Sequence, residues 1–425
     1  MKIKISNIGK IKEADVTING ITVIAGENNT GKSTVGKALY AMFNSFVDVQ
    51  NRIKSERINS ICSSLITLIR SLDAFVTKHS YFYIESIAGT IEKLNSDKKN
   101  EINGEYLAKF LIEKLRLSKD VLQNNSEQLK STVDNILRAL KVGDDVFLKT
   151  VVQSSFSDEF QQQINNKLEN GAGIVELTIK SHKSEVGFDH DIVFLVDKQI
   201  DTFSEAIYLD DPFIIDENPN VGLGSMMYSF GHKAKLAKLV YAQNENNNLV
   251  DKIVAGERLQ NIIEKVHTAC KGKTFFKDNN ELMYQQDNMT IPFKVANLST
   301  GLKTFVILQT LLLSGAIKDG SLIILDEPEI HLHPEWQLLF AELIVMLQKE
   351  FNLHILLNTH SPYFLQAIEV FAEKYKIDDR CEYYLSYNKQ DESFVKRVTG
   401  NLEEIYAKLA KPLQTLENLR YADDE

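Results

Sequence analysis

Hydrophobic and polar residues alternate at the start of the chain. The stretches KIKIS (residues 2–6) and ADVTI (14–18) place an apolar side chain at every second position, and GITVIAG (20–26) is almost continuously apolar. A period of two is typical of a strand with one buried face, whereas a short continuous run is typical of a fully buried strand. We therefore expect three strands here, followed by a glycine-bounded turn and a helix that begins near residue 31.

A helical pattern replaces the alternation from about residue 46 to 170. Apolar residues recur at spacings of three and four, for example in YLAKFLIEKL (106–115) and STVDNILRALKVG (131–143), and no proline occurs in this part. Polar clusters such as NSDKKNEING interrupt the pattern, and no heptad repeat is sustained over the length of a long coiled coil. We expect several separate helices.

Strand and helix patterns alternate again after this region. Strand-like runs are followed by a helical stretch over roughly 227–270, a hairpin, an apolar helix, two buried strands that each precede a helix, a final hairpin and a last helix. The strand-like runs are GIVELTIKSH (173–182), DIVFLVDK (191–198), AIYLDDPFII (206–215), SLIILDE (321–327) and HILLNTHSP (354–362). Because strands and helices alternate at both ends of the chain, we predict an α/β fold with a mostly parallel core sheet, an antiparallel β part and a helical insertion.

The predicted division of the chain has four parts. A first lobe is formed by 1–45 and 171–226, a helical insertion by 46–170, a second lobe by 227–375, and a C-terminal hairpin and helix by 376–425.

Composition narrows the class of protein. The chain has 425 residues, 44% of them hydrophobic and 25% charged, with a formal net charge of −10. These values are ordinary for a globular protein, and the net acidity argues against a wholly basic nucleic-acid-binding surface. The cysteines Cys62, Cys270 and Cys381 form no Cys-x-x-Cys pair, and neither a signal peptide nor a membrane-spanning run is evident. We expect a cytoplasmic protein without a zinc site.

GENNTGKS (26–33) satisfies the phosphate-binding P-loop (Walker A) motif G-x-x-x-x-G-K-[ST]. Glycines let the backbone curl around an anion, and the following helix contributes the positive end of its dipole. A buried strand before the loop and a helix after it provide the expected context. The predicted nucleotide-binding residues are Gly26, Glu27, Asn28, Asn29, Thr30, Gly31, Lys32, Ser33 and Thr34. Lys32 would reach the β- and γ-phosphates of ATP, and the Ser33 hydroxyl would bind Mg²⁺.

Two acids end the buried strand in LIILDEPEIHLHP (322–334). Carboxylates placed there are costly unless a partner compensates them. Together with the P-loop, this arrangement predicts that Asp326 holds Mg²⁺ and that Glu327 orients and deprotonates the attacking water. Without that loop, two solvated acids at a strand end would be an open alternative.

His360 follows the second buried strand, where it could donate a hydrogen bond to a γ-phosphate, and we include it with Glu327 as a candidate catalytic residue. His331 and His333 form an H-x-H pair without an evident third ligand. We expect that pair to pack in a loop.

The decisive stretch for a family resemblance is NLSTGLK (297–303), in which Ser299, Thr300 and Gly301 open a helix. It resembles the LSGGQ-like signature of ABC-type ATPase heads. Together, GENNTGKS, LSTGLK, LIILDEPEIHLHP and LLNTHSP resemble the ABC-class P-loop ATPases related to the overcoming-lysogenization-defect nucleases, SMC-type heads and RecF. The DEPE-x-HLHP form is closer to the overcoming-lysogenization-defect and phage-defence branch than to transporter ATPases. The set of motifs most resembles the PtuA-type ATPases of Septu antiphage systems. These motifs cover about half of the chain.

This resemblance implies more than ATP binding. In such heads the P-loop of one chain faces the signature of another, so hydrolysis would require a head-to-tail homodimer or higher oligomer, with Ser299 and Gly301 completing the site. The related overcoming-lysogenization-defect nucleases carry a Toprim nuclease domain after the ATPase, but only about 60 residues follow His360 here, too few for such a domain. The resemblance therefore implies a separate nuclease subunit of the HNH type.

DNA is a further candidate partner. A lysine cluster in the second lobe would contact it, although such a cluster is more often a solvated face. Its members are Lys233, Lys235, Lys238, Lys271, Lys273 and Lys277.

Two other functions stay open at this stage. One is a RecF- or SMC-like ATPase in DNA repair, and the other is an ATP-gated scaffold with little turnover. The chain also departs from the family pattern, because Thr300 replaces a usual glycine and no glutamine can be assigned to the Q-loop. Gln153 and the run Gln161–Gln163 are candidates by order alone.

Overall fold

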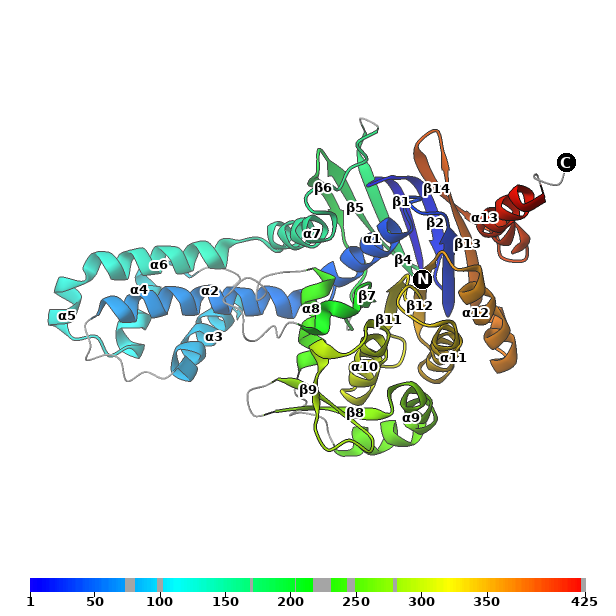
Figure 1. The fold of residues 1–425 in the computed structure, drawn as a ribbon. Helices are drawn as coiled ribbons and strands as arrows, with labels where there is room; N and C mark the ends of the chain where they lie inside the picture. Colours follow the sequence, from blue (N-terminus) through cyan, green and yellow to red (C-terminus); the bar gives the residue numbers. More distant parts are fainter. Residues whose placement is uncertain are drawn as a thin grey trace. The chain divides into compact units, whose positions relative to one another are not determined.

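A computed structural model describes residues 1–72, 81–97, 102–168, 171–202, 204–216, 231–242, 249–277 and 281–421. Figure 1 shows the ribbon. The chain divides into two compact units, one formed by residues 1–47 and 152–425 and the other by residues 48–151. The sequence predicts the helical insertion over 46–170. The helix α7 (Asp144–Phe160) contains residues of both units, because the second unit ends at Val151 in the sequence.

One large mixed sheet organises the first unit. Its strand order is β6-β5-β4-β1-β2-β14-β13-β3-β12-β11-β7. The strands are β1 (Lys2–Ile8), β2 (Ile11–Thr17), β3 (Ile21–Gly26), β4 (Gly173–Ile179), β5 (His182–Asp189), β6 (Ile192–Asp197), β7 (Ile207–Leu209), β11 (Leu322–Asp326), β12 (His354–Thr359), β13 (Cys381–Lys389) and β14 (Glu392–Arg397). From β13 to β7 all neighbouring strands are parallel, whereas from β6 to β2 all are antiparallel.

Helices cover both faces of the parallel part (Figure 1). Alternate residues of β11 show this: Ile323 and Leu325 belong to the hydrophobic core shared with α9 to α12, while Ile324 lies next to Gly36 of α1 on the opposite face. A strand buried on both faces has no solvent-exposed face that would favour polar residues, which explains its continuous apolar sequence. The helices of this unit are α1 (Lys32–Ser45), α8 (His232–Tyr241), α9 (Leu249–Cys270), α10 (Thr300–Leu313), α11 (Pro334–Phe351), α12 (Pro362–Tyr375) and α13 (Glu403–Tyr421).

A second, three-stranded sheet lies between α9 and α10 in the sequence. It has the order β10-β9-β8, with β8 (Gly272–Phe276), β9 (Leu282–Gln286) and β10 (Phe293–Lys294). The β9–β10 hairpin confirms the hairpin that the sequence predicts there.

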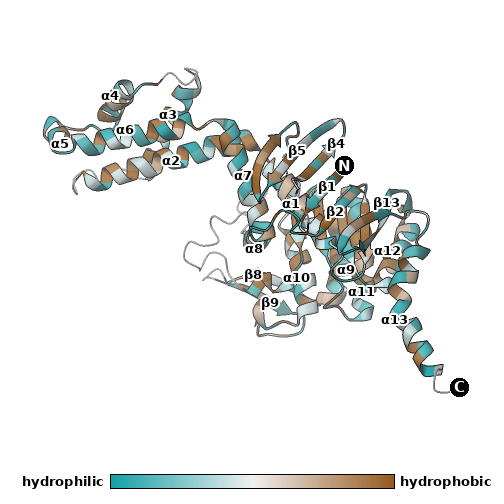
Figure 2. Ribbon diagram, turned by 90° about the horizontal axis from the view of Figure 1, so that it is seen from above, coloured by the Kyte–Doolittle hydropathy of each residue, from teal (hydrophilic) through white to brown (hydrophobic). Residues whose placement is uncertain are grey.

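The second unit is helical. It contains α2 (Val49–Ser71), α3 (Tyr81–Asp97), α4 (Gly104–Lys114), α5 (Lys119–Asn124) and α6 (Ser126–Lys141). Hydrophobic and hydrophilic residues alternate along α2 and α6 in Figure 2, as expected for helices with one buried face. Their apolar positions, such as Leu65 and Ile136, join one core with residues of α3 and α4. None of the described helices combines the length and apolar character that a bilayer span needs.

The predicted fold class is confirmed: an α/β head with a parallel core, an antiparallel part and a helical insertion. Two strands, β5 and β8, were not predicted. The sequence of β5, HKSEVGFD, carries too many polar residues to resemble a strand, yet it pairs with β4 and β6 over its length. In addition, only Ile207–Leu209 of the run AIYLDDPFII is a strand, and Pro212–Asp216 form a 3₁₀ turn.

Candidate functional site

The P-loop connects β3 to α1. Gly31 has a φ of 83°, and a Cβ atom there would lie 2.5 Å from Ile11 Cδ1. A Cβ atom at Gly26 would lie 2.3 Å from the carbonyl oxygen of Ser386 on the neighbouring strand β13. Both glycines are therefore required by the tight path of the chain. No side chain caps the start of α1, which leaves the N–H groups of its first turn free for an anion.

Lys32 points back along the loop. Its Nζ donates hydrogen bonds to the carbonyl oxygens of Gly26 (3.1 Å) and Glu27 (2.8 Å) and lies 3.1 Å from His360 Nδ1. The side chain is only 4% exposed. Burial lowers the pKa of Lys32, and the nearby carboxylates of Glu327 and Asp326 oppose that shift. An ammonium group held in this way is desolvated in advance for an anionic ligand.

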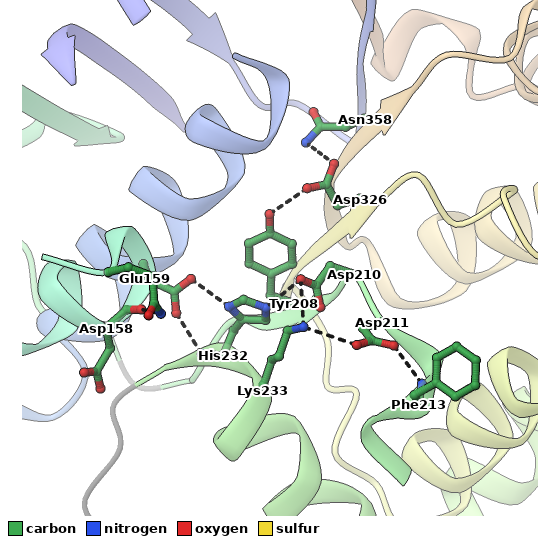
Figure 3. A network of polar contacts seen from close by, with 11 residues as sticks. Asp158, Glu159, Tyr208, Asp210, Asp211, Phe213, His232, Lys233, Asp326 and Asn358 are labelled. Atoms are coloured by element: carbon green, nitrogen blue, oxygen red, sulfur yellow. Dashed lines mark hydrogen bonds and ion pairs between the residues drawn. The ribbon is translucent and has the colours of Figure 1, made fainter. Parts of the chain in front are cut away.

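The acids converge on this loop because their strands are parallel neighbours. Asp326 at the end of β11 pairs in register with Asn358 of β12, and the next residue of β12 pairs with Ala25 of β3. The carboxylate of Asp326 accepts hydrogen bonds of 3.0 Å from Asn358 Nδ2 and from the hydroxyl of Tyr208 (Figure 3). Asp326 is thereby fixed at the same edge of the sheet as the P-loop.

Glu327 and His360 form an ion pair through Glu327 Oε1 and His360 Nε2. Glu327 has a left-handed backbone (φ 52°), and its N–H donates to the carbonyl oxygen of Asn358 at 2.9 Å. The hydrogen bond between the two side chains lowers the pKa of Glu327 and raises that of His360. His360 Nδ1 lies 2.9 Å from the carbonyl oxygen of Gly26 as well as near Lys32. It can donate to that oxygen or accept from Lys32, but not both at once.

Glu329 supports this arrangement through hydrogen bonds to Thr359 and His360, a role that its sequence motif does not predict. It is 4% exposed, and its Oε1 accepts hydrogen bonds from Thr359 Oγ1 and from the backbone N–H of His360 (3.2 Å). Burial raises the pKa of Glu329, although these hydrogen bonds act in the opposite direction. Its position inside DEPEIH was the only signal in the sequence.

A cavity of about 240 Å³ opens in front of these groups. Its lining includes Ser33, Asp210, Thr304, Asp326, Glu327 and His331. A hydroxyl and a carboxylate facing one small space are oxygen donors of the kind that Mg²⁺ prefers, and the lysine-bearing loop at its edge suits a phosphate chain. The residues present therefore fit a nucleotide with a divalent cation. Within the described ranges, no group of three His, Cys, Asp or Glu side chains is arranged to hold a metal by itself.

Residues 1–365 match the AAA ATPase domain family. The chain belongs to this family. Membership implies the use of ATP, and the match covers the P-loop, the acids after β11 and His360.

The individual proteins similar to this AAA ATPase share only a small fraction of its sequence. It is 25% identical over 167 residues to the "Retron Vc95 probable ATPase" of Vibrio cholerae serotype O1 biovar El Tor, an alignment that covers 35% of this chain and only 30% of that protein. Solved structures include an SMC head domain from Thermotoga maritima, at 10% identity and a TM-score of 0.38, covering 93% of this chain and 98% of that one. A second, an SmcHead bound to the C-winged helix domain of ScpA, has 11% identity and a TM-score of 0.42, with 93% and 96% covered.

The two signature residues of the AAA ATPase lie in different environments. Ser299 is exposed and precedes the first turn of α10. Gly301 is buried, and a Cβ atom there would lie 2.8 Å from the carbonyl oxygen of His331 and 3.2 Å from the ring of Trp336. Neither residue lines the cavity, to which α10 contributes Thr304. Contact of Ser299 and Gly301 with a nucleotide remains a prediction.

The remaining candidates from the sequence have other partners. Gln153 donates to the carbonyl oxygen of Asp191 (2.9 Å) and accepts from the N–H of Val193 (2.7 Å), so it holds the β5–β6 turn. Gln161 donates to the carbonyl oxygen of Asp158 at 3.0 Å. His331 packs edge-on against a phenylalanine ring and His333 precedes α11, in line with loop packing.

Part of the lysine cluster is already neutralised. Lys233 forms ion pairs with Asp210 and Asp211, and Lys235 with Glu205. Lys238, Lys271, Lys273 and Lys277 are exposed. DNA contact through these four remains a prediction.

Proposed function

We propose that this chain is an Mg²⁺-dependent ABC-type ATPase that assembles head to tail and regulates a partner nuclease in antiphage defence. The observation that carries the ATPase part is the convergence of Lys32, Ser33, Asp326, Glu327 and His360 at one edge of the parallel sheet. Lys32 and Ser33 follow β3, whereas Asp326, Glu327 and His360 follow β11 and β12 roughly 300 positions later in the sequence, which makes a chance grouping a poor explanation.

Each group has a distinct task in this proposal. Lys32 exchanges its backbone carbonyl partners for the β- and γ-phosphates, and Ser33 and Asp326 hold the cation. Mg²⁺ would neutralise charge on the phosphates when bound. Asp326 needs no rearrangement, because Tyr208 and Asn358 already orient it.

Glu327 takes a proton from the attacking water, and His360 donates to the γ-phosphate. Both side chains must first leave the ion pair that joins them. That pair lowers the pKa of Glu327, which makes the carboxylate a weaker base while the pair lasts. Binding of the γ-phosphate would draw His360 away and free Glu327 for the water.

Assembly would complete the site. A chain with one P-loop and one signature can satisfy both only with a second copy, and Ser299 is exposed for such a contact. We expect Ser299→Arg to abolish hydrolysis and ATP-dependent dimers in size-exclusion chromatography, while binding of the non-hydrolysable analogue AMP-PNP is kept. Ser314→Arg, at the other end of α10, is the matched control. Full hydrolysis by monomeric Ser299→Arg would contradict head-to-tail assembly.

The antiphage role rests on the resemblance of DEPE-x-HLHP and LSTGLK to PtuA-type ATPases, for which an HNH-type nuclease is the expected partner. Co-expression with the product of a neighbouring nuclease gene, followed by co-purification, tests it. A stable complex whose nuclease activity changes with ATP is expected. Absence of any such complex, together with DNA binding that weakens steeply with salt, would instead favour the DNA-repair function.

One observation favours an ATP-gated scaffold as the second candidate. The Glu327–His360 pair restrains the predicted base, so turnover is expected to be slow unless assembly breaks the pair. Steady-state hydrolysis separates the two candidates. A rate that stays near background in the assembled state would favour the scaffold.

A further inference from the structure

Asp210 lies at the same sheet edge as the candidate metal site. It directly follows β7, which runs parallel to β11 with Leu209 opposite Leu325. The carboxyl ends of parallel neighbours meet at one edge, and Asp210 accordingly lines the 240 Å³ cavity together with Ser33 and Asp326. Asp210 belongs to none of the sequence motifs described above.

A buried histidine holds Asp210 in place (Figure 3). His232 Nε2 lies 3.0 Å from Asp210 Oδ2, and Lys233 Nζ lies 3.8 Å from the same oxygen. On the other side of the ring, His232 Nδ1 lies 2.7 Å from Glu159 Oε2, and the His232 N–H donates to Glu159 Oε1 at 2.8 Å. The imidazole is thus fixed by two carboxylates from different elements, α7 and the end of β7.

Electrostatics favour a charged histidine between Asp210 and Glu159. Burial alone lowers the pKa of His232, but Asp210 and Glu159 outweigh burial and raise it to about 9. Burial likewise raises the pKa of Asp210, but His232 and the lysines Lys233 and Lys37 outweigh it, so the net shift is downward. Asp210 therefore presents a permanent negative charge at the cavity at neutral pH.

The same histidine also supports Asp326. The ring of Tyr208 stacks on His232 with centroids 4.4 Å apart and planes 24° apart, and its hydroxyl donates to Asp326 at 3.0 Å. Tyr208 is only 1% exposed. His232 thus positions two carboxylates of one cavity, Asp210 by an ion pair and Asp326 through Tyr208.

We propose that Asp210 is a positioning residue for the divalent cation, accepting hydrogen bonds from water molecules bound to a cation that Ser33 and Asp326 hold. Contact through water suits Mg²⁺, which usually keeps several of its water ligands. This inference rests on the proposed Mg²⁺-dependent ATPase function, and it adds a residue that raises the affinity of the site for Mg²⁺.

The test compares Asp210→Asn with Asp211→Asn. Both residues pair with Lys233, but Asp211 does not line the cavity. AMP-PNP binding is titrated with MgCl₂, and binding in EDTA is measured separately. Losing one charge-assisted, water-mediated contact should raise the half-saturating Mg²⁺ concentration about 10-fold in Asp210→Asn and leave affinity in EDTA unchanged. Asp211→Asn should match the wild type.

A purely structural role gives a different result, since binding would then weaken equally with and without Mg²⁺. That outcome, or an unchanged Mg²⁺ midpoint in a folded Asp210→Asn protein, would overturn the inference. Should Asp210→Asn fail to fold, Asp210→Glu keeps the charge on His232 but moves the carboxylate by one methylene, and the midpoint should still rise. Failure of the wild type to bind AMP-PNP at all would instead refute the proposed function.

Discussion

Replacing Lys32 with methionine separates what this residue does for the fold from what it does for a ligand. Methionine keeps a flexible side chain of similar length and removes the buried ammonium group. In the free protein, Lys32 gives up water for two carbonyl oxygens and a histidine nitrogen, and burial lowers its pKa. The lost hydrogen bonds, worth about 1 kcal/mol each, are offset by the removed cost of burying a cation. We expect the unliganded stability to change by less than about 1 kcal/mol.

Nucleotide binding should respond very differently. Contacts between an ammonium group and phosphate oxygens are worth about 1.5–3 kcal/mol, or roughly a 10- to 150-fold change in affinity. At an ATP concentration 100 times the wild-type Kd, ligand binding stabilises the fold by about 2.7 kcal/mol. With an affinity about 100-fold weaker, the same ATP concentration contributes only about 0.4 kcal/mol.

Thermal unfolding with and without MgATP measures both effects in one assay. The wild type should show a rise in Tm of several degrees, and Lys32→Met should show almost none from a similar starting Tm. Lys318→Met removes an exposed lysine and should behave as the wild type. A retained ATP-induced shift would refute the assigned ligand contact, and a large loss of unliganded stability would show that the ammonium group stabilises the fold.

Two other predictions test the base and a structural ion pair. Glu327→Gln should hydrolyse ATP at least about 100-fold more slowly in a steady-state assay while AMP-PNP affinity stays within about threefold, whereas near-normal turnover would place the base elsewhere. Burial raises the pKa of Glu342, but Lys265, Lys374 and a tyrosine hydroxyl outweigh it and lower the pKa to about 2. The stabilisation by the Glu342 carboxylate is therefore fully present at a pH above the ordinary pKa of glutamate, and it is lost as the pH falls toward about 2. Glu342→Gln should lower the free energy of unfolding by at most about 3 kcal/mol at pH 7 and about 1.4 kcal/mol at pH 3, measured by denaturant unfolding. An equal cost at both pH values would contradict the ion-pair explanation.

Local patterns in the sequence predicted the parts of the site that short, contiguous motifs supply. The P-loop, the strand ending in Asp326 and the strand before His360 could be found because each is a buried run that ends in polar residues. The strand β5 was missed, since its polar residues are tolerated only beside β4 and β6.

Contacts between distant segments could not be found in this way. Glu159, Tyr208, Asp210 and His232 come from three separate segments, and no motif links them. A buried histidine between two acids becomes evident only when α7, β7 and α8 meet in space. The same limit applies to Gly301, whose close approach to His331 depends on the tertiary packing of α10 against the loop after β11.

That close approach has a consequence for communication between subunits. Gly301 lies so close to His331 and Trp336 that the exposed end of α10 packs directly against the loop that follows Glu327. In a head-to-tail pair, a shift of Ser299 toward the neighbour's triphosphate would be transmitted to the home subunit's own water-activating carboxylate. Such a pair would hydrolyse ATP cooperatively, with a Hill coefficient above one, because each site would depend on the neighbouring subunit.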